Sequence, residues 1–336
     1  MNKIAKTVLM TGTALCAAGV VLSTAGYFAG GKDFTYTSDH MYVSGGNSSS
    51  HKNLTVMKKE QIDDFTKLNV DFENFDLDIR TSDDDHYYME YKLEKNGRKN
   101  PLTWKDKDGE LTLEESAGGS GSYYITYDLG IFSTHADLTE KKDALNTVIL
   151  YIPEKAQLSE AELQLSDGDL TADQLLCKEM TLELLNGDLM LDKGEFEKFD
   201  AKFSDGDLNV KELQCTDNMQ LKSGNGDVTI KKAELADGQI ALSDGDLQID
   251  NSSFNGDMKI NSSCGDVSVE MKNGSAEKTN IYLKAADGDV DTEGLSRGKS
   301  DNEEDTSVYE NKAGASAPTL NVKCSDGDIT LTESEK

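Results

Sequence analysis

The chain has 336 residues, with 34 Lys or Arg against 63 Asp or Glu, and its formal net charge is −29. A charge of this sign repels the phosphate backbone and argues against DNA or RNA as a partner. Only 3 prolines stand against 29 glycines, which indicates many tight turns and no proline-rich linker.

The N-terminus predicts a membrane anchor. Residues 7–31 carry no charge and follow a short segment, 1–6, with two lysines. About 20 apolar residues span a bilayer as a helix, and flanking lysines keep their end in the cytoplasm. We therefore expect a cytoplasmic 1–6, a single-pass transmembrane signal-anchor at 7–31, and an extracytoplasmic C-terminal domain. A cleaved signal peptide is the alternative, because Ser23 and Ala25 are small enough for a signal peptidase.

The next two segments lead from the membrane to the repeats. Residues 32–60 include the polar run SGGNSSSHK at 44–52 and predict a stalk. In residues 61–155, polar and apolar side chains alternate at 69–73 and again at 76–80, as in half-buried strands. This stretch predicts an irregular β subdomain that caps the repeats, since terminal repeats are atypical.

Residues 156–333 repeat a Gly-Asp step followed by an aliphatic residue, and apolar residues alternate on both sides of each step. Such alternation predicts strands with one buried face. The successive spacings are 19, 19, 20, 19, 20, 23 and 39 residues. The repeated glycines are Gly168, Gly187, Gly206, Gly226, Gly245, Gly265, Gly288 and Gly327.

Identical corner chemistry in every copy favours stacked coils over a hairpin meander. Stacked coils place equivalent side chains in ladders about 4.8 Å apart, whereas a meander needs no such identity. The sequence therefore predicts an all-β fold, a parallel β-solenoid with about 19–20 residues per coil. Asn255-Gly256-Asp257 repeats the turn chemistry at mid-period, so each coil should bend at least twice. Residues 294–318 fill the longest gap and predict a solvated loop insertion.

The repeat carries a resemblance to a known family. The unit LQLSDGD at 163–169 and the lead-in at 148–153 resemble the bacterial "putative adhesin" family of β-strand-repeat domains of unknown function. The resemblance covers about 65–331. It implies a β-helix-like fold, a single N-terminal anchor of the Gram-positive type, a place in the cell envelope, and a role in adhesion or envelope-stress regulation. It supplies no catalytic residues.

Two acidic columns flank the repeated glycines, and they are the candidate ligand site. Stacked carboxylates would repel by about 1 kcal/mol per pair in water, and bound Ca²⁺ would relieve this. However, the GGxGxDxφx motif of calcium-binding β-rolls is absent, and Asn186, Asn225 and Cys264 interrupt one column. Asp and Asn also serve as ordinary turn residues, which is the interpretation we favour. The weak calcium candidates are Asp167, Asp169, Asp205, Asp207, Asp244 and Asp246.

Neither zinc binding nor catalysis has a sequence signature here. Four cysteines are widely spaced without a CxxC pair, which argues against zinc and leaves their disulfide status open. All four histidines precede the repeats, and none has a nucleophile arrangement beside it. We expect no enzyme activity and no cofactor. These four cysteines are Cys177, Cys215, Cys264 and Cys324, the fifth being Cys16, and the histidines are His40, His51, His86 and His135.

Three functions fit these observations. The first is a non-enzymatic surface adhesin or binding scaffold that offers a long solenoid face to a protein or glycan. The second is an envelope-stress regulatory accessory that works through a membrane partner. The third is a carbohydrate-active β-helix enzyme with paired acids on one face.

Overall fold

The structure is a computed structural model that describes residues 34–36, 41–43, 54–117, 145–292, 295, 298–303 and 306–334. The chain divides into two compact units, Met1–Leu54 with Gly118–Lys141, and Thr55–Ala117 with Lys142–Lys336. The expected signal-anchor at 7–31 lies outside the described residues. Among those that are described, no helix has the length and apolar character needed to cross a membrane.

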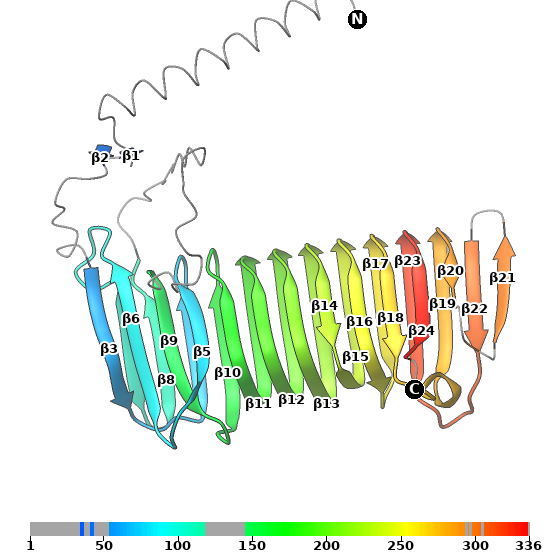
Figure 1. The fold of residues 1–336 in the computed structure, drawn as a ribbon, viewed down its shortest axis with the longest axis horizontal. Helices are drawn as coiled ribbons and strands as arrows, with labels where there is room; N and C mark the ends of the chain where they lie inside the picture. The colour runs from blue at the N-terminus through cyan, green and yellow to red at the C-terminus, as the bar shows by residue number, and fades with distance from the viewer. Residues whose placement is uncertain are drawn as a thin grey trace, which may run out of the picture. The chain divides into compact units, whose positions relative to one another are not determined.

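The described part of the first unit includes an antiparallel pair, and the second unit is one large sheet wound into coils (Figure 1). The described residues are almost entirely strand, with one short 3₁₀ helix. The elements are β1 (Phe34–Tyr36), β2 (Met41–Val43), β3 (Leu54–Ile62), β4 (Lys67–Phe72), β5 (Asp76–Ser82), β6 (Tyr87–Glu94), β7 (Leu102–Lys107), β8 (Glu110–Glu115), β9 (Thr147–Pro153), β10 (Leu158–Leu165), β11 (Leu170–Asn186), β12 (Leu189–Asp205), β13 (Leu208–Asn225), β14 (Val228–Lys231), β15 (Ala233–Asp244), β16 (Leu247–Phe254), β17 (Met258–Cys264), β18 (Val267–Met271), η2 (Ala276–Lys278), β19 (Asn280–Asp287), β20 (Val290–Asp291), β21 (Lys299–Glu303), β22 (Thr306–Asn311), β23 (Thr319–Asp326) and β24 (Ile329–Glu333).

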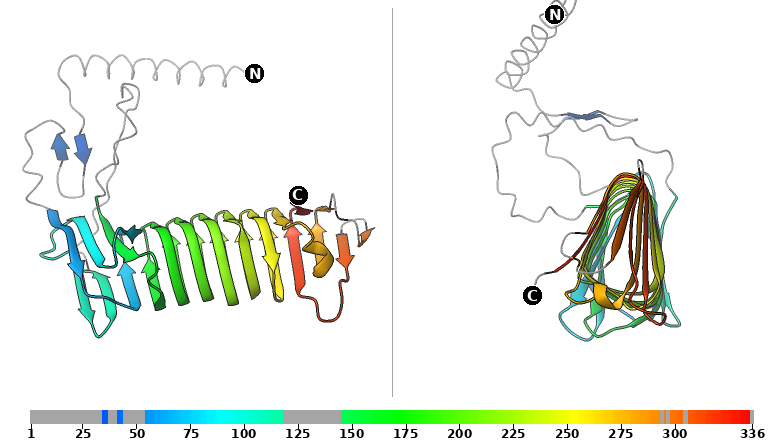
Figure 2. Two further views of the ribbon diagram at one scale, coloured as in Figure 1. Left: turned by 60° about the horizontal axis from the view of Figure 1, so that its bottom comes forward. Right: turned by 90° about the vertical axis from the view of Figure 1, so that its right-hand side faces the viewer.

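The predicted parallel solenoid is confirmed. β11, β12 and β13 pair in parallel, so that Leu170, Leu189 and Leu208 stack in register. In β11 the buried–exposed alternation breaks at 173–174 and 178–179, and the Gly-Asp corner follows at its end. Each coil therefore has three faces, and the coils superpose as a narrow wedge when viewed end-on (Figure 2). We call the three successive segments of a coil its first, second and third faces; in β11 they are residues 170–173, 174–178 and 179–186, and the third face is the strand before each Gly-Asp corner.

The core is a continuous apolar filling inside the coils. It consists mainly of Leu, Ile, Val and Phe, with one to three residues from each face of the regular coils. Most of these side chains are nearly inaccessible to solvent, and fully burying one such side chain contributes about 1.5–3 kcal/mol. Because inward residues are mostly apolar, the period-2 pattern alone specifies which face is buried.

The order of coils in space departs from the order in sequence at the C-terminal end. β23 pairs in parallel with β17 on one side and with β19 on the other, and β24 likewise lies between β18 and β20. The last coil is thus inserted between the two that precede it, as the red strands between yellow and orange show in Figure 1. Part of the expected loop at 294–318 instead forms strands β21 and β22. These strands extend beyond β19 before the chain returns to form β23.

At the N-terminal end, too, the order of coils in space departs from their order in sequence. β4 lies between β8 and β10, and β5 lies between β9 and β11, all in parallel. The stretch expected to be an irregular cap therefore supplies regular coils to the stack. The reason is that its strands bury the same alternating apolar residues, such as Val70 and Leu113, as the repeats do.

Antiparallel strands close both ends of the stack. At one end β6 pairs with β9 and β7 with β8, and β3 pairs with β6. At the other end β22 pairs with β19 and β21 with β22. An exposed parallel edge would present a row of free backbone groups to other chains, and these polar outer strands cover it.

Candidate functional site

The Gly-Asp corners stack so closely that only glycine fits. Gly226 has φ +122°, and a Cβ added to it would collide with the carbonyl oxygen of Gly206. The same contact recurs along the stack, and the C-terminal coils follow their spatial order: Gly327 rests on Gly265, and Gly288 rests on Gly327. The repeated glycine is therefore required by the close approach of one coil to the next.

The aspartate after each glycine forms a continuous hydrogen-bonded column, which we call the aspartate ladder. Each backbone N–H in the ladder donates to Oδ1 of the aspartate in the preceding coil, at 2.8–3.0 Å. One carboxylate oxygen of each inner ladder residue is therefore used to join coils. In stack order the ladder is Asp76, Asp169, Asp188, Asp207, Asp227, Asp246, Asp266, Asp328 and Asp289.

The column before the glycines alternates between neutral and acidic residues from Asn74 to Asp326 and ends with a second aspartate, Asp287. Asn186 Nδ2 donates to Asp167 Oδ1 at 2.7 Å, and Asn225 Nδ2 donates to Asp205 Oδ1 at 2.6 Å. Each asparagine thus separates two carboxylates that would otherwise repel across neighbouring coils. In stack order the column is Asn74, Asp167, Asn186, Asp205, Asn225, Asp244, Cys264, Asp326 and Asp287.

The six calcium candidates therefore lie in two adjacent columns of one corner. Asp169, Asp207 and Asp246 belong to the ladder, and the other three belong to the alternating column. Among the residues that the structure describes, no group of three or more His, Cys, Asp or Glu side chains is arranged to hold a metal ion. Calcium binding stays a hypothesis, and it predicts a higher melting temperature with Ca²⁺ than with a chelator. The turn interpretation predicts no change.

A shorter ladder runs along the mid-period corner. The amide of Asp257 donates to Asp237 Oδ1 at 2.6 Å, and the amide of Thr319 donates to Asp257 Oδ1 at 2.9 Å. The expected second bend is therefore present at Gly256. It uses the same chemistry as the first corner, over fewer coils.

The ladder begins at Asp76, which reasoning from the Gly-Asp motif missed. The corner there reads Asn74-Phe75-Asp76, with Phe75 in the place of glycine. The available signal was the Asp-Leu-x-Ile pattern that starts at Asp76 and matches the repeats. Burial raises the pKa of the Asp76 carboxyl, while the hydroxyl of Thr147 donates to its Oδ2 at 3.3 Å and partly offsets this.

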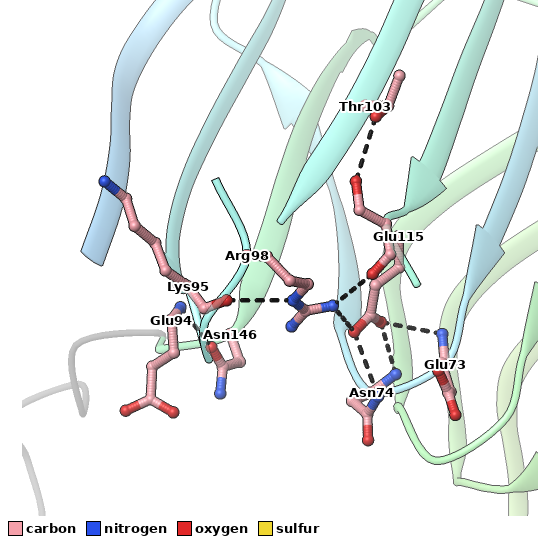
Figure 3. A network of polar contacts seen from close by, with 9 residues as sticks. Glu73, Asn74, Glu94, Lys95, Arg98, Thr103, Glu115 and Asn146 are labelled. Carbon is pink, nitrogen blue, oxygen red and sulfur yellow. Dashed lines mark hydrogen bonds and ion pairs between the residues drawn. The ribbon is translucent and has the colours of Figure 1, made fainter. Parts of the chain in front are cut away.

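A buried ion pair supports this glycine-free corner (Figure 3). Arg98 Nη1 lies 2.8 Å from Glu115 Oε1, and the two side chains are 8% and 1% exposed. Glu115 Oε2 also accepts hydrogen bonds from the backbone amides of Glu73 and Asn74, at 2.9 and 2.6 Å. The guanidinium lies 5.3 Å from the ring centre of Phe75. Here Glu115 and Arg98 hold the bend that glycine stacking holds elsewhere.

The four cysteines in the described residues are free thiols without signs of reactivity. Cys177, Cys215 and Cys324 are buried, whereas Cys264 is exposed. Burial raises the pKa of Cys177 to about 12 and that of Cys215 to about 11, so these thiols stay protonated at neutral pH. Cys324 packs as a small apolar residue, and its Sγ donates weakly to the carbonyl of Gly265.

The hollows on the described surface are shallow. One of about 470 Å³ lies at the C-terminal end beside Tyr282, Glu310 and Asn311. Another, of about 330 Å³, runs along the second face beside the ion pairs Lys193–Glu195 and Lys232–Glu212. Neither brings together a nucleophile and a base. The one histidine in the described residues, His86, is exposed in a turn.

The third face differs from the second in its charges. Its outward side chains include five lysines that form no ion pair within the part of the chain that the structure describes. Parallel register places Lys202 beside Lys222, and Lys323 beside Lys284, with Lys259 close to them in the neighbouring column. The third face was not anticipated from sequence, because its columns depend on the spatial order of the coils.

Fold and corner define the chain as a β-solenoid built on glycine–aspartate corners. The family model Toastrack DUF4097 matches residues 65–332, and the chain belongs to this family. No curated protein matches it.

Solved structures with a similar chain path carry adhesion or lipid-binding descriptions. A "putative adhesin" from Parabacteroides merdae is 15% identical, with 84% of this chain and 97% of that one covered, at a TM-score of 0.44. A "putative adhesin" from Parabacteroides distasonis is 16% identical over the same shares, with a TM-score of 0.43. A "putative lipid binding protein" from Parabacteroides distasonis is 11% identical, again over 84% and 97%, with a TM-score of 0.42.

Proposed function

We propose that this protein is a non-enzymatic binding scaffold of the adhesin type, held on the outer side of the cell membrane by a signal-anchor at 7–31. The observation that carries the proposal is the contrast between corner and face. Corner aspartates are engaged in joining coils, whereas the third face includes lysines that have no ion-pair partner among the described residues and that differ from coil to coil. Surfaces of this kind suit recognition of an extended partner, because solenoids display long faces without a deep pocket.

The membrane part of the proposal rests on the uncharged N-terminal run and its flanking lysines. It is tested by adding protease to intact cells that express the full chain. We expect digestion of the solenoid while a cytoplasmic marker stays intact, and a membrane-bound N-terminal remnant. A solenoid that is protected in intact cells would contradict the proposed location, and a solenoid secreted without residues 1–25 would favour signal-peptide cleavage.

The binding part is tested by changing third-face charges on the full chain in cells. Replacing Lys202, Lys222, Lys284 and Lys323 with Glu should abolish retention on envelope material or neighbouring cells. The matched control replaces Lys193 and Lys232 on the second face, and it should leave retention unchanged. If both variants adhere like the parent, the proposed surface is wrong.

The same strains distinguish the other two functions. Release of soluble sugars from envelope glycans by the parent chain would favour the carbohydrate-active alternative. Loss of phenotype on replacing residues 7–27 with an unrelated apolar helix, with adhesion unaffected by third-face changes, would favour the regulatory accessory acting through a membrane partner.

A further inference from the structure

The hollow of about 470 Å³ at the C-terminal end of the stack lies between β19, β22 and the loop that joins β22 to β23. Tyr282 of β19, Glu310 of β22 and Thr319 of β23 contribute to its walls. Lys312 and Ala315 of the joining loop complete the side that faces them. Sites that hold small molecules commonly enclose about 300–1,000 Å³, so this hollow is large enough for a small ligand.

The loop that forms one wall is held by the side chain of Asn280. Its Nδ2 donates to the carbonyls of Gly314 and Ala317, at 2.9 and 3.0 Å. Its Oδ1 accepts from the backbone amides of Ala313 and Gly314, at 3.0 and 3.2 Å. The wall is thus fixed by contacts within the chain, and a preformed site loses less conformational entropy when it binds a ligand.

Several side chains of this hollow have polar groups that the described part of the chain does not use. Tyr282 is half-buried, and neither its hydroxyl nor that of Thr319 forms a hydrogen bond with another described residue. Glu310 Oε1 lies 3.0 Å from Lys312 Nζ, but both side chains are well exposed. Such a surface pair is weak, so its carboxylate and ammonium groups are able to exchange each other for a ligand.

The hollow is continuous with the third face. Strand pairing places Asn321 on one side of Tyr282 and Glu310 on the other. Two positions further along the same strands, Lys284 lies beside Lys323. A ligand in the hollow would therefore be next to the lysines to which the proposed function assigns binding.

We propose that this hollow binds one pyranose ring of a glycan. The aromatic ring of Tyr282 packs against the face of the sugar that is rich in C–H groups. Each sugar hydroxyl both donates and accepts, and it is matched by Glu310, which accepts, and Lys312, which donates. The free hydroxyl of Thr319 provides a further partner for the edge of the sugar.

Other classes of ligand fit the hollow less well. An extended peptide is recognised mainly through the free backbone groups of a sheet edge, but β19 is paired on both sides, with β22 and β23. An apolar ligand requires a deeper cavity from which water is excluded, whereas this hollow is open and shallow. A shallow site leaves both ends of a polymer free, which suits one sugar within a longer chain.

The hollow is remote from the N-terminal end of the stack. Ten third-face strands run in parallel from β8 to β19, and nine spacings of about 4.8 Å give about 43 Å. The strand that follows the expected stalk, β3, belongs to the opposite end (Figure 1). This inference deepens the proposed function and rests on it, since it names a saccharide as the ligand of the binding scaffold.

The inference is tested by measuring saccharide binding to the purified full-length chain. A polyoxyethylene detergent is used because it carries no sugar headgroup. The probes are four tetrasaccharides, built from β-1,4-linked N-acetylglucosamine, glucose, mannose or galacturonic acid, and affinities come from saturation-transfer NMR titrations. We expect at least one probe to bind with a Kd of about 1 mM or tighter, as suits a contact of the size of one sugar ring.

Variants of the aromatic wall give the sharpest result. Tyr282→Ala should weaken binding about tenfold or more, because it removes the ring on which the sugar packs. Tyr282→Phe keeps the ring and loses only the hydroxyl, so it should weaken binding about threefold. Asn280→Ala leaves Tyr282 in place but releases the loop wall, and it should also weaken binding about tenfold.

The matched control is Tyr88→Ala. Tyr88 is also a half-buried tyrosine, but it lies on β6 at the opposite end of the stack. Its removal should leave the affinity unchanged. Unfolding midpoints verify that every variant folds.

Three outcomes would overturn the inference. In the first, the parent binds none of the four probes at about 10 mM. In the second, a bound probe keeps its affinity in Tyr282→Ala. In the third, the parent binds a tetra-alanine peptide and no sugar, which would assign the hollow to a peptide.

Failure here is distinguishable from failure of the proposed function. If the third-face lysine variant loses retention on envelope material while Tyr282→Ala keeps both retention and sugar affinity, the scaffold function stands and the saccharide inference is wrong. If neither variant changes retention and no sugar binds, both are wrong.

Discussion

The middle of the solenoid and its two ends are built by different rules. From β10 to β17 each coil follows the previous one in both sequence and space, and one corner motif suffices for all of them. At the C-terminal end the chain skips one level of the stack, forms the β19 coil, returns through antiparallel β21 and β22, and fills the skipped level with β23. At the N-terminal end the order is reversed: β4 and β5 form first, the outer coil of β8 and β9 follows, and the chain then crosses the first coil to begin β10. The comparison teaches that a repeat specifies the coil, whereas closing the stack requires long-range pairing.

The interleaved ends also differ from the middle in what holds them. Middle coils are joined to neighbours in sequence, so their contacts are formed between segments about 20 residues apart. The end coils depend on segments such as β4 and β10, which are separated by about 90 residues. Long loops are closed late in folding, since their entropy must be overcome before contacts form. We therefore expect the stability of the fold to be more sensitive to truncation or substitution at the ends than in the middle.

Removing the inserted C-terminal coil, residues 319–336, should have the largest effect. Its apolar side chains are nearly fully buried, with Leu320, Val322 and Leu331 each 0% exposed, and their loss leaves β17 and β19 without a shared neighbour. Burial of these three alone corresponds to about 5–9 kcal/mol. We expect the region from β17 to β22 to lose hydrogen-exchange protection and the chain to aggregate. A stop after Ser334 is the control, and undiminished protection of β19 in the long truncation would contradict the interleaved order.

Gly226→Ala tests the middle of the stack. The added Cβ meets the carbonyl of Gly206 and the residue keeps φ +122°, so we expect a loss of about 4 kcal/mol in unfolding free energy, measured with urea. Gly274→Ala is the matched control. It also has positive φ, +73°, but nothing lies within 4 Å of its Cβ position, and about 1 kcal/mol is expected. Equal losses at both sites would mean that backbone strain, and not coil contact, explains the repeated glycine at the corner.

Glu115→Ala tests the glycine-free corner at the N-terminal end. It leaves Arg98 buried without its partner and the amides of Glu73 and Asn74 without an acceptor, so we expect a loss of about 3–5 kcal/mol. The exposed pair Lys198–Glu179 provides the comparison, and Glu179→Ala should change stability little. Urea unfolding measures both. A similar small effect at the two sites would show that the bend does not depend on the buried pair.

Asp76→Asn should give the smallest effect, with a distinctive pH dependence. Burial raises the pKa of Asp76 in the folded chain, so its ionised form is disfavoured there and stability falls as pH rises through that pKa. Asn keeps an oxygen for the amide of Asp169 and should stabilise the fold slightly at pH 7, with the gain vanishing in acid. Melting temperatures at pH 7 and pH 4 test this. Asp207→Asn controls for loss of one charge, and a pH-independent gain at Asp76 would contradict the mechanism.

Several features of this protein could be inferred without coordinates. The period-2 alternation specifies which residues face the core. The glycine at each corner is a local steric requirement, so the solenoid, its period and its bends follow from Gly168, Gly226 and their equivalents. The corner role of the aspartates also follows, because a turn carboxylate beside free amides will accept from them. These properties depend on one coil and its immediate neighbour.

Other features depend on which distant segments meet. Nothing local distinguishes β23 from a coil that continues the stack beyond β19, yet it lies between β17 and β19, because that place buries both of its edges. The charge pattern of the third face follows from that order, since Lys323 and Lys284 become neighbours only there. The corner glycines can therefore be identified from the sequence alone. The third face, in contrast, forms only when every coil occupies its position in the stack.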